Sequence, residues 1–123
     1  MVREYEEINE LVVSRLLTDP YNLKILCATY RTPRSARQLA YMFDIPIATC
    51  YRKLRELERA QLISCVDRPL SPQGRRYSRY RSELEGMTVQ FEKGKLRIRL
   101  QLAYRMPMEI VETAETLMSK STS

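Results

Sequence analysis

Apolar residues recur at helical spacing through the first thirty residues, which predicts two helices. The apolar stripe of the first helix, which should end near Thr18, consists of Ile8, Leu11, Val12, Leu16 and Leu17. Asp19 suits the N-cap of the second helix, and Pro20 suits its first position, where the missing N–H costs nothing. The apolar stripe of this second helix consists of Leu23, Leu26, Cys27 and Tyr30. It should end before Thr32-Pro33, because a residue that precedes proline disfavours helical backbone angles.

Residues 35–60 predict a pair of helices joined by about three residues. Ser35 and Gln38 fit a capping box at the start of the third helix, whose apolar positions are Leu39, Met42 and Phe43. The sequence Asp44-Ile45-Pro46 breaks this helix, and Pro46 suits the first turn of a fourth helix over about residues 46–60.

The fourth helix predicts one buried side and one basic side. Cys50, Leu54 and Leu57 recur at i, i+4 and i+7 and form its buried stripe. The opposite side and its flanks carry Ala48, Thr49, Tyr51, Arg52, Arg55 and Arg59. The helical wheel places Ile47 toward the core.

After Leu62 the spacing changes from helical to extended. The runs LISCV and RRYSRYRS flank DRPLSPQG, whose two prolines and glycine forbid a helix and favour a projecting turn. Residues 67–82 therefore predict a hairpin with an irregular tip.

The run MTVQFEKGKLRIRLQL predicts a second hairpin around a Lys93-Gly94 loop. In this register polar residues face polar ones and apolar residues face apolar ones, as in the pair Phe91 and Leu96. The apolar face should be half-buried and consists of Met87, Val89, Phe91, Leu96, Ile98 and Leu100. The run PMEIVETAETLMSK then predicts a C-terminal amphipathic helix, with apolar positions Ile110, Val111, Ala114, Leu117 and Met118.

A helix, a short turn, a second helix and a basic hairpin follow one another in the order of a winged helix-turn-helix, whose second helix enters the DNA major groove. The predicted fold class is α+β, a winged helix-turn-helix with an added β-hairpin and a C-terminal amphipathic helix. Residues 1–83 should form the DNA-binding domain. Residues 84–123 could complete the core, form a dimer interface or bind an effector, and dimerisation is the favoured role.

The charge of the chain is concentrated in its middle. The net charge is +6, yet residues 31–82 hold twelve Arg and Lys against four Asp and Glu, a net +8. A confined basic block is the electrostatic footprint of a protein that binds a polyanion. The opposing interpretation is a solvated helix with internal pairs such as Arg52 with Glu56.

The fourth helix supplies the candidates for reading bases. Ala48 permits close approach or contact with a thymine methyl group, Thr49 and Tyr51 offer hydroxyl groups, and Arg52 or Arg55 could bind guanine through two hydrogen bonds. Lys53 and Arg59 lie to one side or further along and are expected to contact phosphate.

Two further segments supply candidates for contacting the DNA backbone. The hairpin at 67–82 carries Arg68, Arg75 and Arg76, of which the last two follow the Gly74 bend. At least one of Tyr77 and Tyr80 is expected to pack on its strand. The N-terminus of the third helix carries Arg34, Ser35 and Arg37 and could hold phosphate through free N–H groups.

Other functional classes find little support in the composition. The chain has no histidine, and Cys27, Cys50 and Cys65 are too widely spaced for a disulfide framework or a CxxC motif. We therefore expect no enzymatic activity, metal or cofactor, and we expect the cysteines to be reduced and buried, with a thiol or metal sensor as the less favoured role. No segment is apolar enough for a membrane span or has the order of a secretory signal, so a cytoplasmic protein is expected.

The segment SARQLAYMFDIPIATCYRKLRELERAQLIS resembles the ArsR-type winged-helix transcriptional regulators, especially the small archaeal forms. With LLTDPYNLKIL upstream and GRRYSRY downstream, the resemblance covers roughly residues 11–82. It implies a homodimer that binds pseudo-palindromic operators, and it would let Ile47 reach the groove. Gln61 stands where the family commonly has glycine, and the cysteine pair of the metal-sensing members is missing.

The leading hypothesis is thus a sequence-specific regulator of transcription that binds double-stranded DNA. The alternative is a winged-helix module that binds protein or RNA in the transcription or translation machinery. The operator, the effector and the sign of regulation cannot be read from the sequence.

Overall fold

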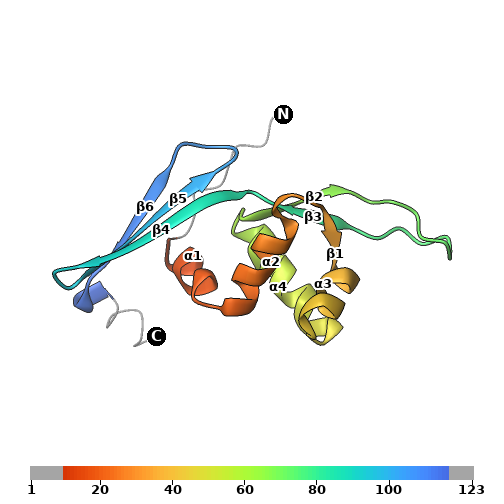
Figure 1. The fold of residues 1–123 in the computed structure, drawn as a ribbon, viewed down its shortest axis with the longest axis horizontal. Coiled ribbons are helices and arrows are strands. Elements are labelled where there is room, and N and C mark those ends of the chain that lie inside the picture. The colour runs from red at the N-terminus through yellow and green to blue at the C-terminus, as the bar shows by residue number, and fades with distance from the viewer. Residues whose placement is uncertain (1–9, 117–123) are drawn as a thin grey trace.

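The computed structural model describes residues 10–116, which form four helices and two small antiparallel sheets (Figure 1). The helices are α1 (Glu10–Leu17), α2 (Pro20–Tyr30), α3 (Ala36–Phe43) and α4 (Ile47–Arg59). One sheet has the order β1-β3-β2, with β1 (Arg34–Ser35), β2 (Ile63–Asp67) and β3 (Arg79–Ser82). The other has the order β4-β5-β6, with β4 (Leu84–Glu92), β5 (Lys95–Leu102) and β6 (Met108–Glu112). The fold class is α+β, as predicted.

The starts of α2 and α3 follow from local sequence. The Asp19 carboxylate accepts the Tyr21 N–H at 2.8 Å and caps α2. At α3, the Ser35 hydroxyl oxygen accepts the Gln38 N–H at 3.2 Å, while the Gln38 side chain accepts the Ser35 N–H at 2.9 Å. The predicted capping box is confirmed, because these bonds satisfy N–H groups that have no partner within the helix.

The turn between α3 and α4 is tight. Asp44 adopts a left-handed conformation with φ of 52°, which ends α3, and the Ile45 N–H donates to the Ala40 carbonyl at 2.9 Å. Pro46 then precedes the first turn of α4. The predicted stripe of Cys50, Leu54 and Leu57 is fully buried. The short connection therefore fixes α4 against α3 and directs its other side to solvent.

The C-terminal end of α4 is held by two backbone hydrogen bonds. The Leu62 N–H donates to the Leu57 carbonyl and the Gln61 N–H donates to the Glu58 carbonyl, each at 3.0 Å, as in a Schellman motif. Gln61 takes the left-handed conformation with φ of 66°, which glycine adopts more readily. The helix therefore ends in a Schellman motif although Gln61, rather than a glycine, takes the left-handed position.

The hairpin predicted at 67–82 is confirmed. β2 and β3 pair antiparallel, with Cys65 opposite Tyr80 and a bulge before Asp67. Residues 68–78, which we call the wing, extend beyond the paired strands (Figure 1). Leu70 and Arg76 form an isolated bridge, and Gly74 turns the tip with φ of 80°.

The second sheet confirms one prediction and corrects another. All four predicted pairs of the β4–β5 hairpin are present, from Glu92 with Lys95 to Val89 with Ile98. Lys93 and Gly94 both have positive φ, as a two-residue turn of this type requires. The helix predicted from residue 107 is wrong over Met108–Glu112, which is strand β6.

Residues 108–112 form a strand because the free edge of β5 offers them backbone pairing and side-chain contacts that the local sequence does not reveal. Each residue from Met108 to Glu112 pairs with one of β5, and the Glu109 carboxylate lies 3.2 Å from the Arg97 guanidinium. Helical residues begin only at Ala114, after a cap in which Thr113 and Thr116 exchange hydrogen bonds. The predicted apolar positions Leu117 and Met118 lie outside the described residues.

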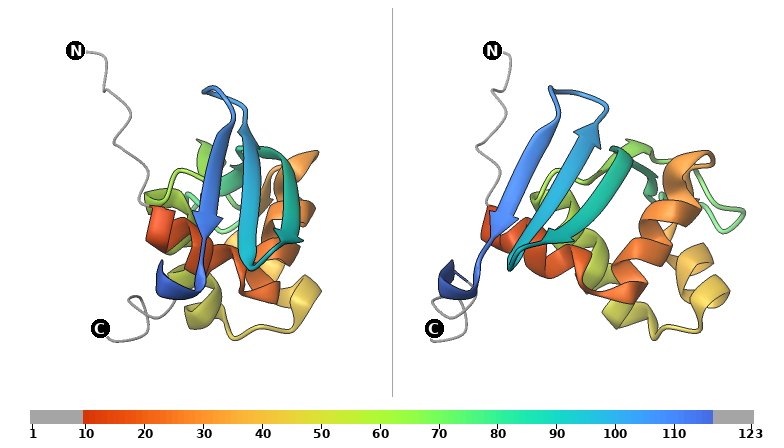
Figure 2. Two further views of the ribbon diagram at one scale, coloured as in Figure 1. Left: turned by 90° about the vertical axis from the view of Figure 1, so that its left-hand side faces the viewer. Right: turned by 60° about the vertical axis from the view of Figure 1, so that its left-hand side comes forward.

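Both sheets share one hydrophobic core with the helices. Figure 2 shows β4, β5 and β6 as a layer beside α1, and the core includes Val13 of α1 together with Ile98, Leu100 and Ile110 of this layer. The hairpin projects past the helices, which leaves Val89 and Phe91 58% and 76% exposed. The expectation that its whole apolar face is half-buried is therefore wrong at these two positions.

The sides that the first two helices bury differ from their predicted apolar stripes. In α1, Val13 is buried whereas Leu11 and Val12 are exposed, and Ile8 lies outside the described residues. In α2 the buried residues are Asn22, Ile25, Leu26 and Thr29. The predicted positions Cys27 and Tyr30 are exposed, as is Met42 of α3. These helices are covered on sides that depend on the distant sheets, which helical spacing alone does not reveal.

Candidate nucleic-acid interface

The outer side of α4 is fully accessible. Ala48, Arg52, Arg55 and Arg59 are exposed, and Thr49 is half-buried on the flank. Tyr51 is 47% exposed and Ile47 is 44% exposed. Ile47 therefore points to solvent, against the placement that the helical wheel favours.

Lys53 is the exception on this helix. It is 7% exposed, and its ammonium group forms a salt bridge with the Asp19 carboxylate at the start of α2. The ring of Tyr21 also lies 5.8 Å from the Lys53 nitrogen. The expectation that Lys53 contacts phosphate is therefore wrong, because its charge is used inside the protein to hold α4 against α2.

The same salt bridge perturbs Asp19. Burial by itself would raise the pKa of the Asp19 carboxyl, but the hydrogen bonds from Lys53 and from the Tyr21 N–H outweigh it. The pKa consequently lies below its ordinary value, and Asp19 stays ionised at neutral pH.

The three outward arginines of α4 differ in their partners. The Arg52 guanidinium lies 3.4 Å from the Glu56 carboxylate, so the opposing interpretation of an internal pair holds for this residue. Both side chains are largely exposed, and such a pair on a helix surface contributes only about 0.3–0.5 kcal/mol. Within residues 10–116, Arg55 and Arg59 form no salt bridge. Their charges are available to a polyanion.

The wing is held by hydrogen bonds at its base and along its length. At the base, the Arg79 guanidinium binds both carboxylate oxygens of Asp67, with one N–O distance of 2.8 Å. That contact lowers the pKa of Asp67. Further out, the Arg76 guanidinium donates to the Arg68 carbonyl at 3.1 Å. The wing is thus ordered, but it has no buried side chain of its own.

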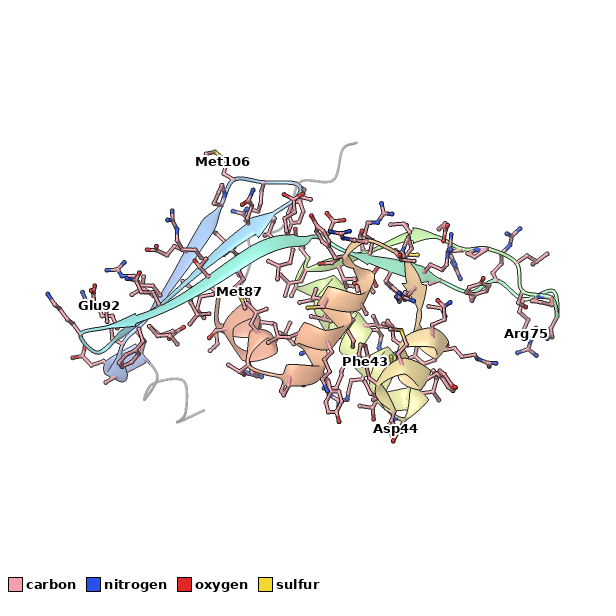
Figure 3. The ribbon with its side chains drawn as sticks, viewed as in Figure 1. Phe43, Asp44, Arg75, Met87, Glu92 and Met106 are labelled. Atoms are coloured by element: carbon pink, nitrogen blue, oxygen red, sulfur yellow. The ribbon has the colours of Figure 1, made fainter. Side chains whose placement is uncertain are left out.

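The candidate arginines of the wing, Arg68, Arg75 and Arg76, are all exposed. Figure 3 shows Arg75 at the outermost point of the wing. A loop with positive charge at its tip and no apolar anchor suits contact with phosphate or with a narrow groove.

Tyr80 lies in β3 at the base of the wing. Burial raises the pKa of its hydroxyl group and outweighs a hydrogen bond with Ser78, which lowers it, while the charges of Glu58, Cys65 and Tyr51 raise it further. Glu58 and Tyr51 belong to α4, whereas Tyr80 belongs to β3. The prediction that one tyrosine of this hairpin packs on its strand is confirmed by Tyr80, which packs against the core. The two basic elements are adjacent, because α4 packs against β2, the strand from which the wing begins.

The residues at the start of α3 divide between structural and accessible positions. Ser35 is buried and caps the helix, and the Arg34 guanidinium donates through Nε to the Ala28 carbonyl at 2.7 Å. Arg37 is exposed. Of the three residues expected to hold phosphate, Arg37 is the one whose side chain is not tied to the protein by a hydrogen bond or salt bridge within the described residues.

The cysteines follow the prediction only in part. Cys50 is buried and its pKa is raised by burial, but Cys27 and Cys65 are exposed. Cys27 lines an open groove of about 370 Å³ between α2 and β4, together with Leu23, Leu26 and Met87. Among the described residues no three side chains of the metal-binding types gather, and no helix is long and apolar enough to cross a membrane.

Part of the chain is similar to a known protein family. Residues 17–66 match the family model of a helix-turn-helix domain. The match begins at the end of α1, includes α2, α3 and α4, and ends in β2. This part of the chain is therefore similar to a helix-turn-helix domain. No curated protein matches the chain. The match supports a regulator of the helix-turn-helix type, in which α4 is the second helix of the motif.

Proposed function

We propose that the protein is a sequence-specific regulator of transcription that binds double-stranded DNA, with α4 in the major groove and the wing on the backbone or in the minor groove. One observation carries the proposal: both basic elements are exposed, and α4 packs against β2, the strand from which the wing begins. Within the helix-turn-helix fold, this is the arrangement in which one duplex contacts both elements.

The roles assigned to the two elements differ. Arg55 projects from the rigid α4 without a salt bridge within the described residues, so it is the best candidate for a bidentate contact with guanine. Ala48, Thr49, Tyr51 and Arg52 lie around it on the same helix. Arg59, Arg37 and the wing arginines contact phosphate and set the position of the protein on the duplex.

The first experiment is a selection of bound duplexes from a random library, followed by affinity measurements on a selected duplex and on a scrambled one. Replacing Arg55 by Ala should weaken binding to the selected duplex by about 1–3 kcal/mol and leave the scrambled duplex nearly unaffected. Replacing Arg76 by Ala should weaken binding to both duplexes by similar factors. It should also reduce the slope of log affinity against log salt concentration by about one.

Arg105 provides a matched control, because it is exposed in the loop between β5 and β6 and forms no salt bridge within residues 10–116. The Arg105→Ala variant should bind like the unchanged protein. Equal losses from Arg55→Ala and Arg76→Ala on both duplexes would refute base reading by α4. Failure to bind duplex DNA even near 50 mM salt, together with tight binding of structured RNA, would favour the RNA-binding alternative.

We further propose that the protein acts as a homodimer of the ArsR type, with the projecting end of the β4–β5 hairpin, within residues 84–123, at the dimer interface. The support is the exposed apolar pair Val89 and Phe91 on the projecting hairpin. Sedimentation should show a dimer that the Phe91→Glu variant converts to a monomer, with unchanged far-ultraviolet circular dichroism. A dimer that survives this substitution would place the interface elsewhere.

A further inference from the structure

The N-terminal half of α4 presents apolar side chains to solvent. Ile47, Ala48 and Tyr51 are all exposed there, and the first charged residue of the helix is Arg52. The turn at Asp44, labelled in Figure 3, leads into this end of the helix. The basic block that marks the middle of the chain is thus absent from the end of α4 where recognition helices contact base edges.

The turn into α4 holds two isoleucines, of which Ile47 is exposed. Ile45, only two residues earlier in the same turn, is buried. The tight turn therefore directs one isoleucine inward and the other outward. Of the Ile47 side chain, 44% stays exposed, and burying this apolar surface against a partner would be favourable.

Ile47 also lies in line with the polar residues proposed to read bases. Ile47, Tyr51 and Arg55 follow one another at i, i+4 and i+8, so they form one row along the outer side of α4. At a rise of 1.5 Å per residue, the row is about 12 Å long. Ala48 and Arg52 lie beside it. A single row that changes from apolar to basic can meet different chemical groups along one groove.

The chemistry of the major groove limits what Ile47 can recognise there. The isoleucine and alanine side chains have no hydrogen-bond donor or acceptor, and the apolar group on a base edge in the major groove is the 5-methyl group of thymine. Resting on the function proposed above, we propose that Ile47, supported by Ala48, determines specificity by contacting a thymine methyl group in each half-site.

The test removes this methyl group without changing any hydrogen bond. Each thymine of a selected duplex is replaced in turn by deoxyuridine, and the affinity of the unchanged protein and of the Ile47→Ala variant is measured for every duplex. At one or two positions, deoxyuridine should weaken binding of the unchanged protein about fourfold, the value of one buried methyl group. The same replacements should weaken the Ile47→Ala variant less than twofold.

Met106 supplies the matched control, since it is an 81% exposed apolar residue that lies far from the Asp44 turn in Figure 3. The Met106→Ala variant should keep the full sensitivity to deoxyuridine. Because Ile47 is exposed, its replacement should leave the thermal midpoint unchanged, so a loss of sensitivity cannot be attributed to unfolding.

The outcomes separate the two proposals. Sensitivity at no thymine, or sensitivity that persists in the Ile47→Ala variant, overturns the role of Ile47 while the DNA-binding function stands. Failure of the unchanged protein to select any duplex overturns the DNA-binding function itself, and the role of Ile47 with it.

Discussion

The fourth helix and the wing are both basic, but the protein holds them in different ways. α4 is anchored by a fully buried stripe and by the salt bridge from Lys53 to Asp19. The wing has no buried side chain and is held by hydrogen bonds, which include those from Arg79 to Asp67 at its base and from Arg76 to the Arg68 carbonyl. A rigid helix can keep side chains in register with base edges, whereas a loop without a buried anchor is better suited to contacts with the DNA backbone or with a narrow groove.

The largest expected effect comes from the anchor of α4. Replacing Leu54, which is 1% exposed, by Ala should lower the free energy of unfolding by about 3 kcal/mol, because it leaves a cavity beneath the helix. Replacing Leu70 of the wing, which is 57% exposed, by Ala should change it by no more than about 0.5 kcal/mol. Urea unfolding measures both. Comparable losses would show that the wing is anchored as firmly as the helix.

A smaller effect is expected from the salt bridge beneath α4. Replacing Asp19 by Asn keeps a good N-cap but leaves the buried Lys53 ammonium without its carboxylate, which should cost on the order of 2 kcal/mol at neutral pH. The exposed Asp67 at the base of the wing is the matched control, and Asp67→Asn should not shift the unfolding midpoint measurably at physiological salt.

The salt bridge between Lys53 and Asp19 also predicts how the free energy of unfolding changes with pH. Because folding lowers the pKa of Asp19 below its ordinary value of 3.8, the stability that it contributes is fully present above about pH 4. It is lost as the pH falls through the lower pKa of the folded protein. The difference in unfolding free energy between the unchanged protein and Asp19→Asn should therefore shrink between pH 4 and pH 2. A difference that stays constant over this range would contradict the proposed linkage.

Much of the fold could be predicted from short stretches of sequence. The capping box at Ser35, the turn at Asp44 and the register around Lys93-Gly94 each depend on residues a few positions apart. The buried stripe of α4 belongs to the same class, since Cys50, Leu54 and Leu57 lie on one side of any regular helix. In such cases the sequence carries both partners of the interaction within one element.

The candidate site could be predicted only in part. The arginines of α4 and the wing are exposed, as the charge pattern indicates, yet the sequence does not reveal which charges have partners. Lys53 appears equivalent to its neighbours until Asp19, 34 positions away in the chain, is brought beside it. Its burial has one signal in the sequence: on a helical wheel Lys53 lies next to the stripe of Cys50, Leu54 and Leu57.

The sequence by itself determined the helix-turn-helix elements, the two hairpins and the concentration of charge in residues 31–82, because spacing, caps and turns act over a few residues. Only the tertiary structure decided that Met108–Glu112 is a strand, that Lys53 is buried and that Ile47 is exposed. The first two depend on a distant element, which supplies a free strand edge for β6 and a carboxylate for Lys53, and the third depends on the turn at Asp44, which buries Ile45 and exposes Ile47.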